Sequence, residues 1–153
     1  MKAQPLQRRS LLQELSAQGI RITTQRRILI GIIQDAKEHL DAAALLALAR
    51  KRDAQIDRAT VYRTLDLLKK LRLIEELDLM HLSGEKHFYE ASTTVDHVHL
   101  ACFQCGQIVE FTSPLFEQLK QEMARRNGFQ IRVTRLEAGG LCRDCRTREE
   151  RVN

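Results

Sequence analysis

The feature that most constrains this chain is a repeated C-x2-C motif, formed by Cys102 and Cys105 and again by Cys142 and Cys145. Each pair can bind one metal ion from a tight turn, and two such pairs supply the four thiolates of a tetrahedral zinc site. Thirty-six residues separate the pairs, more than in a compact zinc ribbon, so a whole subdomain must lie between them. We therefore predict a structural Zn²⁺ ion bound by these four cysteines.

Two alternatives to zinc are a pair of disulfides and four unrelated thiols in a core. The N-terminal residues are polar and amphipathic, without the continuous apolar core of a signal peptide. No apolar run approaches the roughly 18 residues of a membrane span. We therefore expect a cytoplasmic protein without a membrane partner, where disulfides are disfavoured. The paired spacing argues against four unrelated thiols, and thiolates closed around a metal ion are unsuited to nucleophilic catalysis.

A second metal site is predicted in the stretch HVHLACFQCGQIVEF, which begins at His97. His97 and His99 are two residues apart and would share one face of a strand. If the hairpin is symmetric about its turn, the numbers of paired residues sum to 209 and His99 faces Glu110. Two imidazoles and a carboxylate suit Fe(II), Mn(II) or Zn(II). The alternative is that these are ordinary surface or core histidines, and a single bulge would disrupt this register.

The N-terminal half has the pattern of several short helices followed by a β-hairpin. Helical spacing and capping residues predict four helices, at residues 7–18, 23–36 and 41–52 and within residues 55–74, with Thr23 or Thr24, Asp41 and Asp57 as N-caps. In the last of these helices the inward positions are Val61, Leu65 and Leu68, and the opposite face carries Arg58, Tyr62, Arg63 and Lys69. LIEELDL and KHFYE, joined by a turn at Ser83–Glu85, predict the hairpin.

This order of elements is typical of a winged helix-turn-helix, in which one helix enters the major groove and the hairpin lies along the DNA backbone. Residues 1–90 hold 16 Lys and Arg against 12 Asp and Glu, so most of the net charge of +5 lies in this half. A basic surplus is compatible with a phosphate backbone as partner. The helix pattern alone fits equally a helical bundle whose basic residues only keep it soluble.

The C-terminal half predicts a smaller α/β unit. Residues 91–97 are polar and predict a hinge, and HLACF and QIVEF are expected to be strands. Residues 113–128 predict a helix with Ser113 as N-cap, Pro114 at its first position and Gly128 at its end. The alternation in FQIRVTRLE, residues 129–137, predicts a third strand. The cysteine pairs would then join the first hairpin to the C-terminal segment.

Five motifs together resemble the ferric uptake regulator (Fur) family; in chain order they are GIRITTQRRILIGII, IDRATVYRTLDLL, HFYE, HVHLACFQCGQIVEF and GGLCRDC. They span residues 19–145. The resemblance implies a dimeric bacterial transcription regulator, usually a repressor, that is not an enzyme and has no small-molecule substrate. It implies an α+β fold: a winged-helix domain at residues 1–90, a hinge at 91–96, and a small α/β dimerisation and metal-binding domain at 97–153. The partner would be a palindromic, AT-rich double-stranded operator.

The resemblance also implies a role for individual residues. A regulatory metal at the hinge would be bound by residues from both halves and favour the DNA-binding arrangement; these residues are His39, Glu90, His97, His99 and Glu110. The DNA contacts would come from the recognition helix and from the start of an earlier helix, at Arg58, Thr60, Tyr62 and Arg63 and at Thr24, Gln25 and Arg26. Zinc on the four cysteines would stabilise the dimerisation domain.

The resemblance favours Fe(II) as the regulatory ion. Zinc-sensing relatives recruit a cysteine into that site, whereas all four cysteines here belong to the C-x2-C pairs. Peroxide-sensing relatives favour aspartates, whereas this chain has Glu90 and Glu110. Manganese-, zinc- and peroxide-responsive regulators remain alternatives. Two other classes also remain open: a metallohydrolase, although no H-E-x-x-H signature is present, and a metal-independent interaction protein with a zinc staple.

Four further residues are less readily assigned. Some relatives bind an additional metal around the first histidine pair, but Asp96 and Val98 stand at those positions, and a valine cannot ligate. We therefore expect this additional site to be absent or impaired. His87 is expected on the surface as at most an accessory ligand, and His81 has no evident partner in the hairpin turn.

Overall fold

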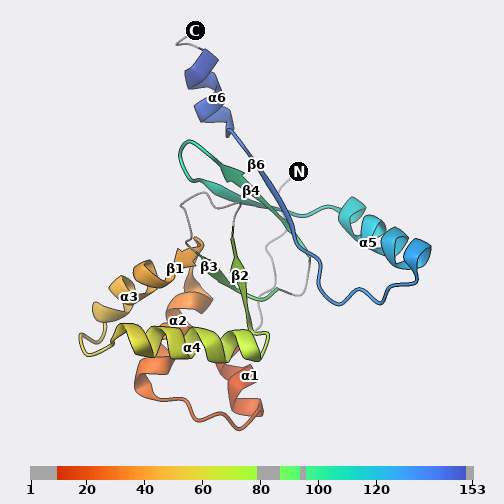
Figure 1. The fold of residues 1–153 in the computed structure, drawn as a ribbon. Coiled ribbons are helices and arrows are strands. Elements are labelled where there is room, and N and C mark those ends of the chain that lie inside the picture. The colour runs from red at the N-terminus through yellow and green to blue at the C-terminus, as the bar shows by residue number, and fades with distance from the viewer. Residues whose placement is uncertain (1–9, 79–86, 94–95, 151–153) are drawn as a thin grey trace. The chain divides into compact units, whose positions relative to one another are not determined.

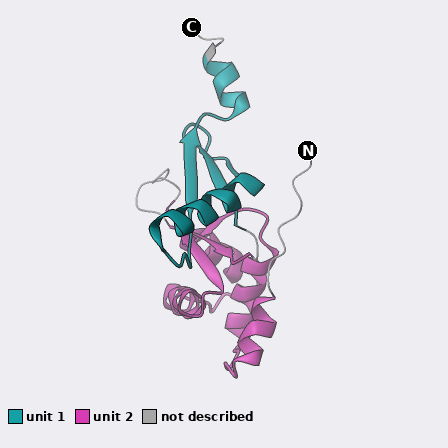
Figure 2. Cartoon of the chain, turned by 90° about the vertical axis from the view of Figure 1, so that its right-hand side faces the viewer, with its two compact units in different colours: residues 1–6, 79–84, 95–153 teal, residues 7–78, 85–94 magenta. Residues whose placement is uncertain are grey.

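The computed structural model describes residues 10–78, 87–93 and 96–150 of the chain. The chain separates into two compact units, coloured in Figure 2. Unit 2 contains residues 10–78 and 87–93 of the described chain, and unit 1 contains residues 96–150. Among the described residues, no helix has both the length and the apolar character needed to cross a membrane. Each unit has its own sheet and its own helices (Figure 1).

Unit 2 begins with four helices: α1 (Leu11–Ala17), α2 (Thr24–Asp35), α3 (Ala42–Arg50) and α4 (Arg58–Lys70). The predicted N-caps of the last three helices are confirmed. Thr23, Asp41 and Asp57 each accept a hydrogen bond from the amide three residues ahead, at 3.3, 2.7 and 2.6 Å. These bonds satisfy amides that have no partner within the helix. The capping residues therefore define where α2, α3 and α4 begin.

The core of unit 2 is formed by the inward faces of these helices and by the sheet they cover. Val61, Leu65 and Leu68 of α4 are fully buried, as predicted. In α2, Leu29 is fully buried, while Ile28 is only partly buried against the core. The rest of the core comes from α1, α3, the strands and the segment between α3 and α4, including Leu11, Leu15, Leu45, Ala49, Ile56, Ile74 and Tyr89.

The sheet of unit 2 has three short antiparallel strands in the order β1-β3-β2: β1 (Leu40–Asp41), β2 (Ile74–Leu77) and β3 (Phe88–Ala91). Strands β2 and β3 are the predicted hairpin, and their register pairs Glu76 with Tyr89 and Glu75 with Glu90. The predicted turn at Ser83–Glu85 lies outside the described residues. Strand β1 was not predicted. It forms between α2 and α3 and pairs with β3, so four helices and a three-stranded wing make a winged helix-turn-helix.

Unit 1 contains a three-stranded sheet, a long helix and a short C-terminal helix. Its strands are β4 (Val98–Cys102), β5 (Ile108–Phe111) and β6 (Leu136–Gly140), in the order β5-β4-β6. Strand β5 runs antiparallel to β4, and β6 runs parallel to it. Helix α5 (Pro114–Asn127) has the predicted Ser113 N-cap and ends at Gly128, whose φ of +67° favours glycine. The predicted α+β fold class is therefore confirmed.

The prediction of a third strand at residues 129–137 is wrong in its position. Residues 129–135 are not a strand, Phe129 and Val133 are 71% and 64% exposed, and β6 begins only at Leu136. Alternation of apolar residues indicates that a segment is covered on one face, but it does not say whether the covering surface belongs to the same chain. Helix α6 (Arg143–Glu150) was not predicted.

Candidate metal centres and nucleic-acid interface

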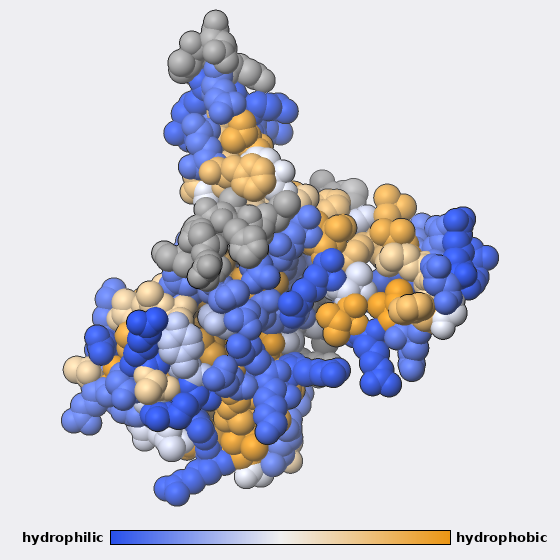
Figure 3. Space-filling view, in the orientation of Figure 1, coloured by the Kyte–Doolittle hydropathy of each residue, from blue (hydrophilic) through white to orange (hydrophobic). Residues whose placement is uncertain are grey.

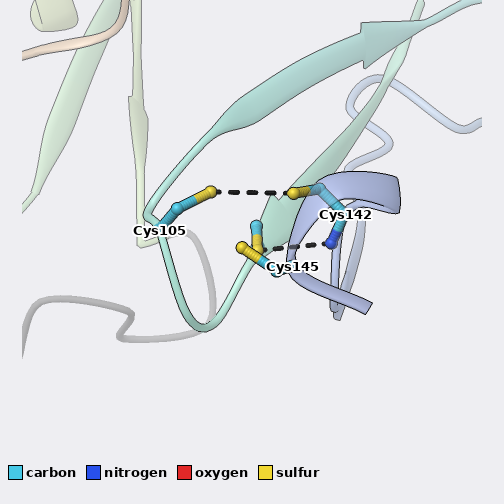
Figure 4. Close-up of side chains that lie close together, drawn as sticks. Cys105, Cys142 and Cys145 are labelled. Atoms are coloured by element: carbon cyan, nitrogen blue, oxygen red, sulfur yellow. Dashed lines mark hydrogen bonds between the residues drawn. The ribbon is translucent and has the colours of Figure 1, made fainter. Parts of the chain in front are cut away.

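The four cysteines lie together in unit 1. Cys102 ends strand β4 and Cys105 lies in the turn that follows, while Cys142 and Cys145 lie at the start of α6 (Figure 4). All four Sγ atoms are within 4.8 Å of one another, and those of Cys105 and Cys142 are 3.8 Å apart. Tetrahedral zinc with Zn–S bonds of about 2.3 Å separates its sulfurs by about 3.8 Å. The predicted convergence of the two C-x2-C pairs is confirmed, and its dimensions fit a tetrahedral metal ion.

The backbone around the cysteines favours a thiolate. The Cys142 amide donates to Cys102 Sγ at 3.3 Å, and this bond together with one from the Cys105 amide lowers the pKa of Cys102 to about 6. Burial raises the pKa of Cys145 to about 12, and the neighbouring thiols add to this rise. Four thiolates in one place repel one another, so the cluster needs a cation to be fully ionised. None of the four cysteines forms a disulfide.

The histidine-rich strand of unit 1 has the predicted register. His99 pairs with Glu110 in the β4–β5 ladder, and the Cys102 amide donates to the Gln107 carbonyl at 2.8 Å. The Nε2 atoms of His97 and His99 are 3.1 Å apart, and both side chains are buried. Two imidazoles and a carboxylate therefore project from neighbouring positions of one hairpin, as a metal-binding set requires.

The other two predicted regulatory ligands, His39 and Glu90, contact each other in unit 2. His39 Nε2 and Glu90 Oε2 are 3.0 Å apart, and their side chains are only 7% and 4% exposed. The β1–β3 ladder produces this contact, because Leu40 of β1 pairs with Tyr89 of β3. His39 immediately precedes β1, and Glu90 follows Tyr89. The missed strand β1 is therefore the element that brings this histidine to this glutamate.

The predicted DNA-contacting face of α4 is exposed. Arg58, Tyr62 and Arg63 are exposed, and the Arg58 guanidinium lies 5.5 Å from the centre of the Tyr62 ring. Arg63 Nη2 donates to Thr60 Oγ1 at 3.1 Å. The Asp57 N-cap accepts from both the side chain and the amide of Thr60, and these bonds lower the pKa of its carboxyl group. This face offers cationic, aromatic and hydroxyl groups of the kind that read base edges.

The second predicted set of DNA contacts lies at the first turn of α2. Thr24 is exposed, Gln25 and Arg26 are partly exposed, and Arg26 Nη1 donates to the carbonyl of Arg21 at 3.2 Å. The N-terminus of a helix presents amides and a positive dipole, which favour a phosphate group. The residue types at this end of α2 therefore suit contact with a DNA backbone.

Lys69 does not belong to the open face of α4 with the other basic residues. Its Nζ lies 2.9 Å from Glu76 Oε2 in β2 and 3.4 Å from Asp66, and the bond to Glu76 raises its pKa. The Tyr89 hydroxyl donates to the other oxygen of Glu76 at 3.2 Å. The last turn of α4 contacts the wing, so this lysine faces the sheet. Helical periodicity could not reveal this contact because it depends on where β2 lies.

The remaining predicted residues have local partners. Asp96 forms an ion pair with Lys120 of α5, and Val98 is buried. His87 is about half exposed, and its Nδ1 lies 2.7 Å from Asp78 Oδ1. Both side chains of this contact are exposed, in agreement with the expected surface position of His87. His81 lies outside the described residues.

Comparison with known proteins identifies relatives along nearly the whole chain. The sequence model of the Ferric uptake regulator family matches residues 17–138. The ferric uptake regulation protein of Brucella abortus is 36% identical over 128 residues, which cover 82% of this chain and 86% of that protein. This match and the family model each cover most of the chain.

Two solved structures are also similar. A zinc-bound manganese uptake regulator is 33% identical, with a TM-score of 0.68 over 88% of this chain and 99% of that one. A zinc uptake regulator complexed with zinc and DNA is 26% identical, with a TM-score of 0.64 over 91% and 92% of the two chains. The names of these relatives include iron, manganese and zinc. The chain belongs to the Ferric uptake regulator family, whose members are metal-responsive transcription regulators.

Proposed function

We propose that this protein is a DNA-binding repressor that responds to Fe(II). The observation that supports this most directly is how the five candidate ligands are distributed. His39 and Glu90 form a buried pair in unit 2, and His97, His99 and Glu110 form a set in unit 1. Neither set alone supplies enough ligands for a tetrahedral or octahedral site. A divalent ion that uses both sets would bind one arrangement of the two units better than any other.

This differential binding is the proposed mechanism of regulation. An ion held by both units stabilises the arrangement in which both sets of ligands meet, and it shifts the population toward that arrangement. A change from a minor to a dominant population needs a difference in affinity of about 10⁴, or roughly 5 kcal/mol. Several additional ligands can supply this difference. The His39–Glu90 contact would then be the part of the site that belongs to the DNA-binding unit.

The DNA-reading surface is proposed to be helix α4, with the start of α2 on the phosphate backbone. Tyr62 and Arg63 are exposed where α4 is free to enter a groove, and a guanine and a thymine methyl group are natural partners for such side chains. Arg58, Thr60, Thr24, Gln25 and Arg26 are proposed to position the duplex. A palindromic, AT-rich operator would match a dimer that presents two such helices.

The four-cysteine cluster is proposed to hold structural Zn²⁺. Its donors are all thiols, the 3.8 Å sulfur separation fits tetrahedral coordination, and an amide already stabilises the Cys102 thiolate. When bound, the ion supplies positive charge that offsets the repulsion among four thiolates. It would also join the β4–β5 turn to the start of α6.

Homodimerisation is proposed through the exposed apolar side chains of unit 1. Figure 3 shows apolar residues gathered over α5 and the chain that follows it. Leu115 and Phe129 are each 71% exposed, Val133 is 64% exposed, and Leu119 and Leu136 are nearly half exposed. So many large apolar side chains in one small unit indicate an interface rather than a solvent face. A second copy would cover them and bring two winged helices onto one operator.

Fe(II) is proposed as the effector because of the donor types. The regulatory set contains imidazoles and carboxylates, which suit Fe(II) and Mn(II), whereas the cysteines that zinc prefers are all gathered in the separate cluster. The Brucella abortus relative is named for ferric uptake regulation, which agrees with this choice. Mn(II) is the second candidate, because it takes the same donors.

The test is binding of a labelled palindromic duplex under anaerobic conditions, with and without Fe(II), and with Mn(II) as an air-stable substitute. The proposal predicts tight binding only with metal, and a steep fall in affinity with salt, because phosphate contacts release counterions. An equal affinity for the duplex with and without metal would instead favour a metal-independent interaction protein with a structural zinc. Failure to bind any duplex would reject the regulator and leave a hydrolytic metal site to be tested.

A further inference from the structure

Strand β3 carries two chemically different faces within the winged-helix unit. Side chains alternate along a strand, so Tyr89 and Glu90 point to opposite faces of the sheet. The register places Tyr89 opposite Glu76 on one face and Glu90 opposite Glu75 on the other. Glu90 contacts His39, the other candidate metal ligand of this unit. Tyr89 faces the helices and belongs to the hydrophobic core.

On the helix side, three residues form a connected polar network. The Tyr89 hydroxyl donates to Glu76 Oε1 at 3.2 Å, and Lys69 Nζ donates to Glu76 Oε2 at 2.9 Å. The same ammonium lies 5.9 Å from the centre of the Tyr89 ring. One carboxylate therefore receives a hydrogen bond from strand β3 and another from helix α4. Tyr89 is only 5% exposed, so its hydroxyl has little access to solvent.

We propose that Lys69, Glu76 and Tyr89 are positioning residues for metal-responsive DNA binding, which tie the strand that carries Glu90 to the end of helix α4. The inference rests on the function proposed above, in which Glu90 is a regulatory ligand and α4 contacts the operator. It assigns a set of contacts within the DNA-binding unit through which metal binding at Glu90 would alter the position of the DNA-contacting face of α4.

The geometry supports this connection through the rigidity of its parts. Tyr89 and Glu90 are neighbours on a paired strand, so a displacement that draws Glu90 toward an ion also moves Tyr89 and the carboxylate bonded to it. Lys69 lies in the last turn of α4, whose 13 residues span about 20 Å. Because a helix of this length is stiff, a change at Lys69 alters the direction of the whole helix and hence the placement of Tyr62 and Arg63.

A purely structural role is the competing explanation. A partly exposed ion pair usually contributes little to stability, and a stabilising contact would affect DNA binding equally with and without metal. A positioning role instead changes the ratio of the two affinities, because the network biases one orientation of α4 when Glu90 is engaged. The metal-dependent gain in DNA affinity therefore separates the two roles.

The experiment measures the operator Kd of the full-length protein without metal and with Mn(II), and the Mn(II) affinity of the free protein. Tyr89→Phe removes one hydroxyl and keeps the ring, and Lys69→Met removes the ammonium. We expect each to reduce the metal-dependent gain by about three-fold or more, the effect of one hydrogen bond, with Mn(II) affinity changed less than about two-fold. Lys69→Arg, which can still reach Glu76, should restore the gain.

Lys70→Met is the matched control, because Lys70 is exposed and is the next residue of the same helix. It removes the same charge and should weaken DNA binding equally with and without metal, leaving the gain unchanged. The inference is overturned if Tyr89→Phe and Lys69→Met keep the wild-type gain, or if their loss of gain merely follows a loss of Mn(II) affinity. If the wild-type protein itself shows no gain, the proposed function fails and the inference fails with it.

Discussion

His99 lies directly opposite Glu110 in the antiparallel ladder of unit 1, and His97 lies two residues earlier, immediately before strand β4. This pairing fixes which side chains share a face, because a shift of one residue would move every side chain to the other side of the sheet. The hairpin turn holds Cys105, and Cys102 ends the strand, so the same register also places the cysteines. One short hairpin therefore organises both the candidate zinc cluster and part of the proposed regulatory site.

The cysteine cluster predicts a specific loss of zinc. In the Cys102→Ser/Cys105→Ser double variant, two of four thiolates are absent, so we expect the tightly held zinc to fall from one per chain to none, with a lower melting temperature. Metal analysis after dialysis against a weak chelator measures this. His99→Ala is the control and should keep that zinc. A double variant that folds, dimerises and retains its full metal content would show that the cysteines do not hold the ion.

The exposed face of α4 predicts that removal of one side chain, that of Arg63, reduces operator specificity. Arg63→Ala removes an exposed guanidinium and should weaken binding of the best operator by about 1–3 kcal/mol, with less effect on unrelated DNA. Competition titrations against the two duplexes measure the ratio. Lys51→Ala removes the same charge from an exposed position at the end of α3 and should leave this ratio unchanged. Equal weakening for both duplexes would assign Arg63 to the phosphate backbone instead.

The sequence predicted local features well, and the reason lies in what determines them. The caps Thr23, Asp41 and Asp57 each bond an amide three residues away, and the His99–Glu110 register follows from a turn of four residues. Both depend on interactions between residues that are close in the chain. A reader of the sequence can therefore place them without knowing the rest of the fold.

Features that depend on distant partners were missed. Strand β6 pairs in parallel with β4, and nothing in its sequence LEAGG marks that partner or its start at Leu136. Strand β1 has only two residues and exists because β3 lies beside it. The contact between Lys69 and Glu76 likewise depends on how α4 packs over the wing. In each case the tertiary neighbour, rather than the local pattern, decides the outcome.

The exposed apolar residues of unit 1 predict a defined change of oligomeric state. Phe129→Glu places a charge where the proposed partner copy would pack, and a central aromatic residue of an interface typically contributes about 2 kcal/mol or more. We expect a monomer at concentrations where the wild type is a dimer, measured by sedimentation velocity. Leu48→Glu introduces the same charge at an exposed apolar position of unit 2 and should leave the dimer intact. If the Phe129→Glu variant is still a dimer, the interface lies elsewhere on the protein.

The Asp57 cap predicts a pH-dependent contribution to stability. Hydrogen bonds from Thr60 lower the pKa of Asp57 in the folded state, so its ionised form stabilises the fold. This contribution is present above the unfolded pKa of about 3.9 and is lost as pH falls through the lower folded pKa. The neutral amide of Asp57→Asn keeps the cap but not the charge. The stability difference between the two proteins should therefore disappear in acid, as urea titrations at several pH values can measure.

The most direct test of the central claim is operator binding titrated with Fe(II) under anaerobic conditions, for wild-type protein and for His39→Ala and His99→Ala, one ligand lost from each unit. We predict that the operator affinity of the wild type rises steeply with Fe(II), and that the affinity of either variant rises little or not at all. Both variants should keep one tightly held zinc, and without added Fe(II) they should bind DNA as the wild type does. If both variants respond to Fe(II) as strongly as the wild type, no ion shared by the two units controls DNA binding.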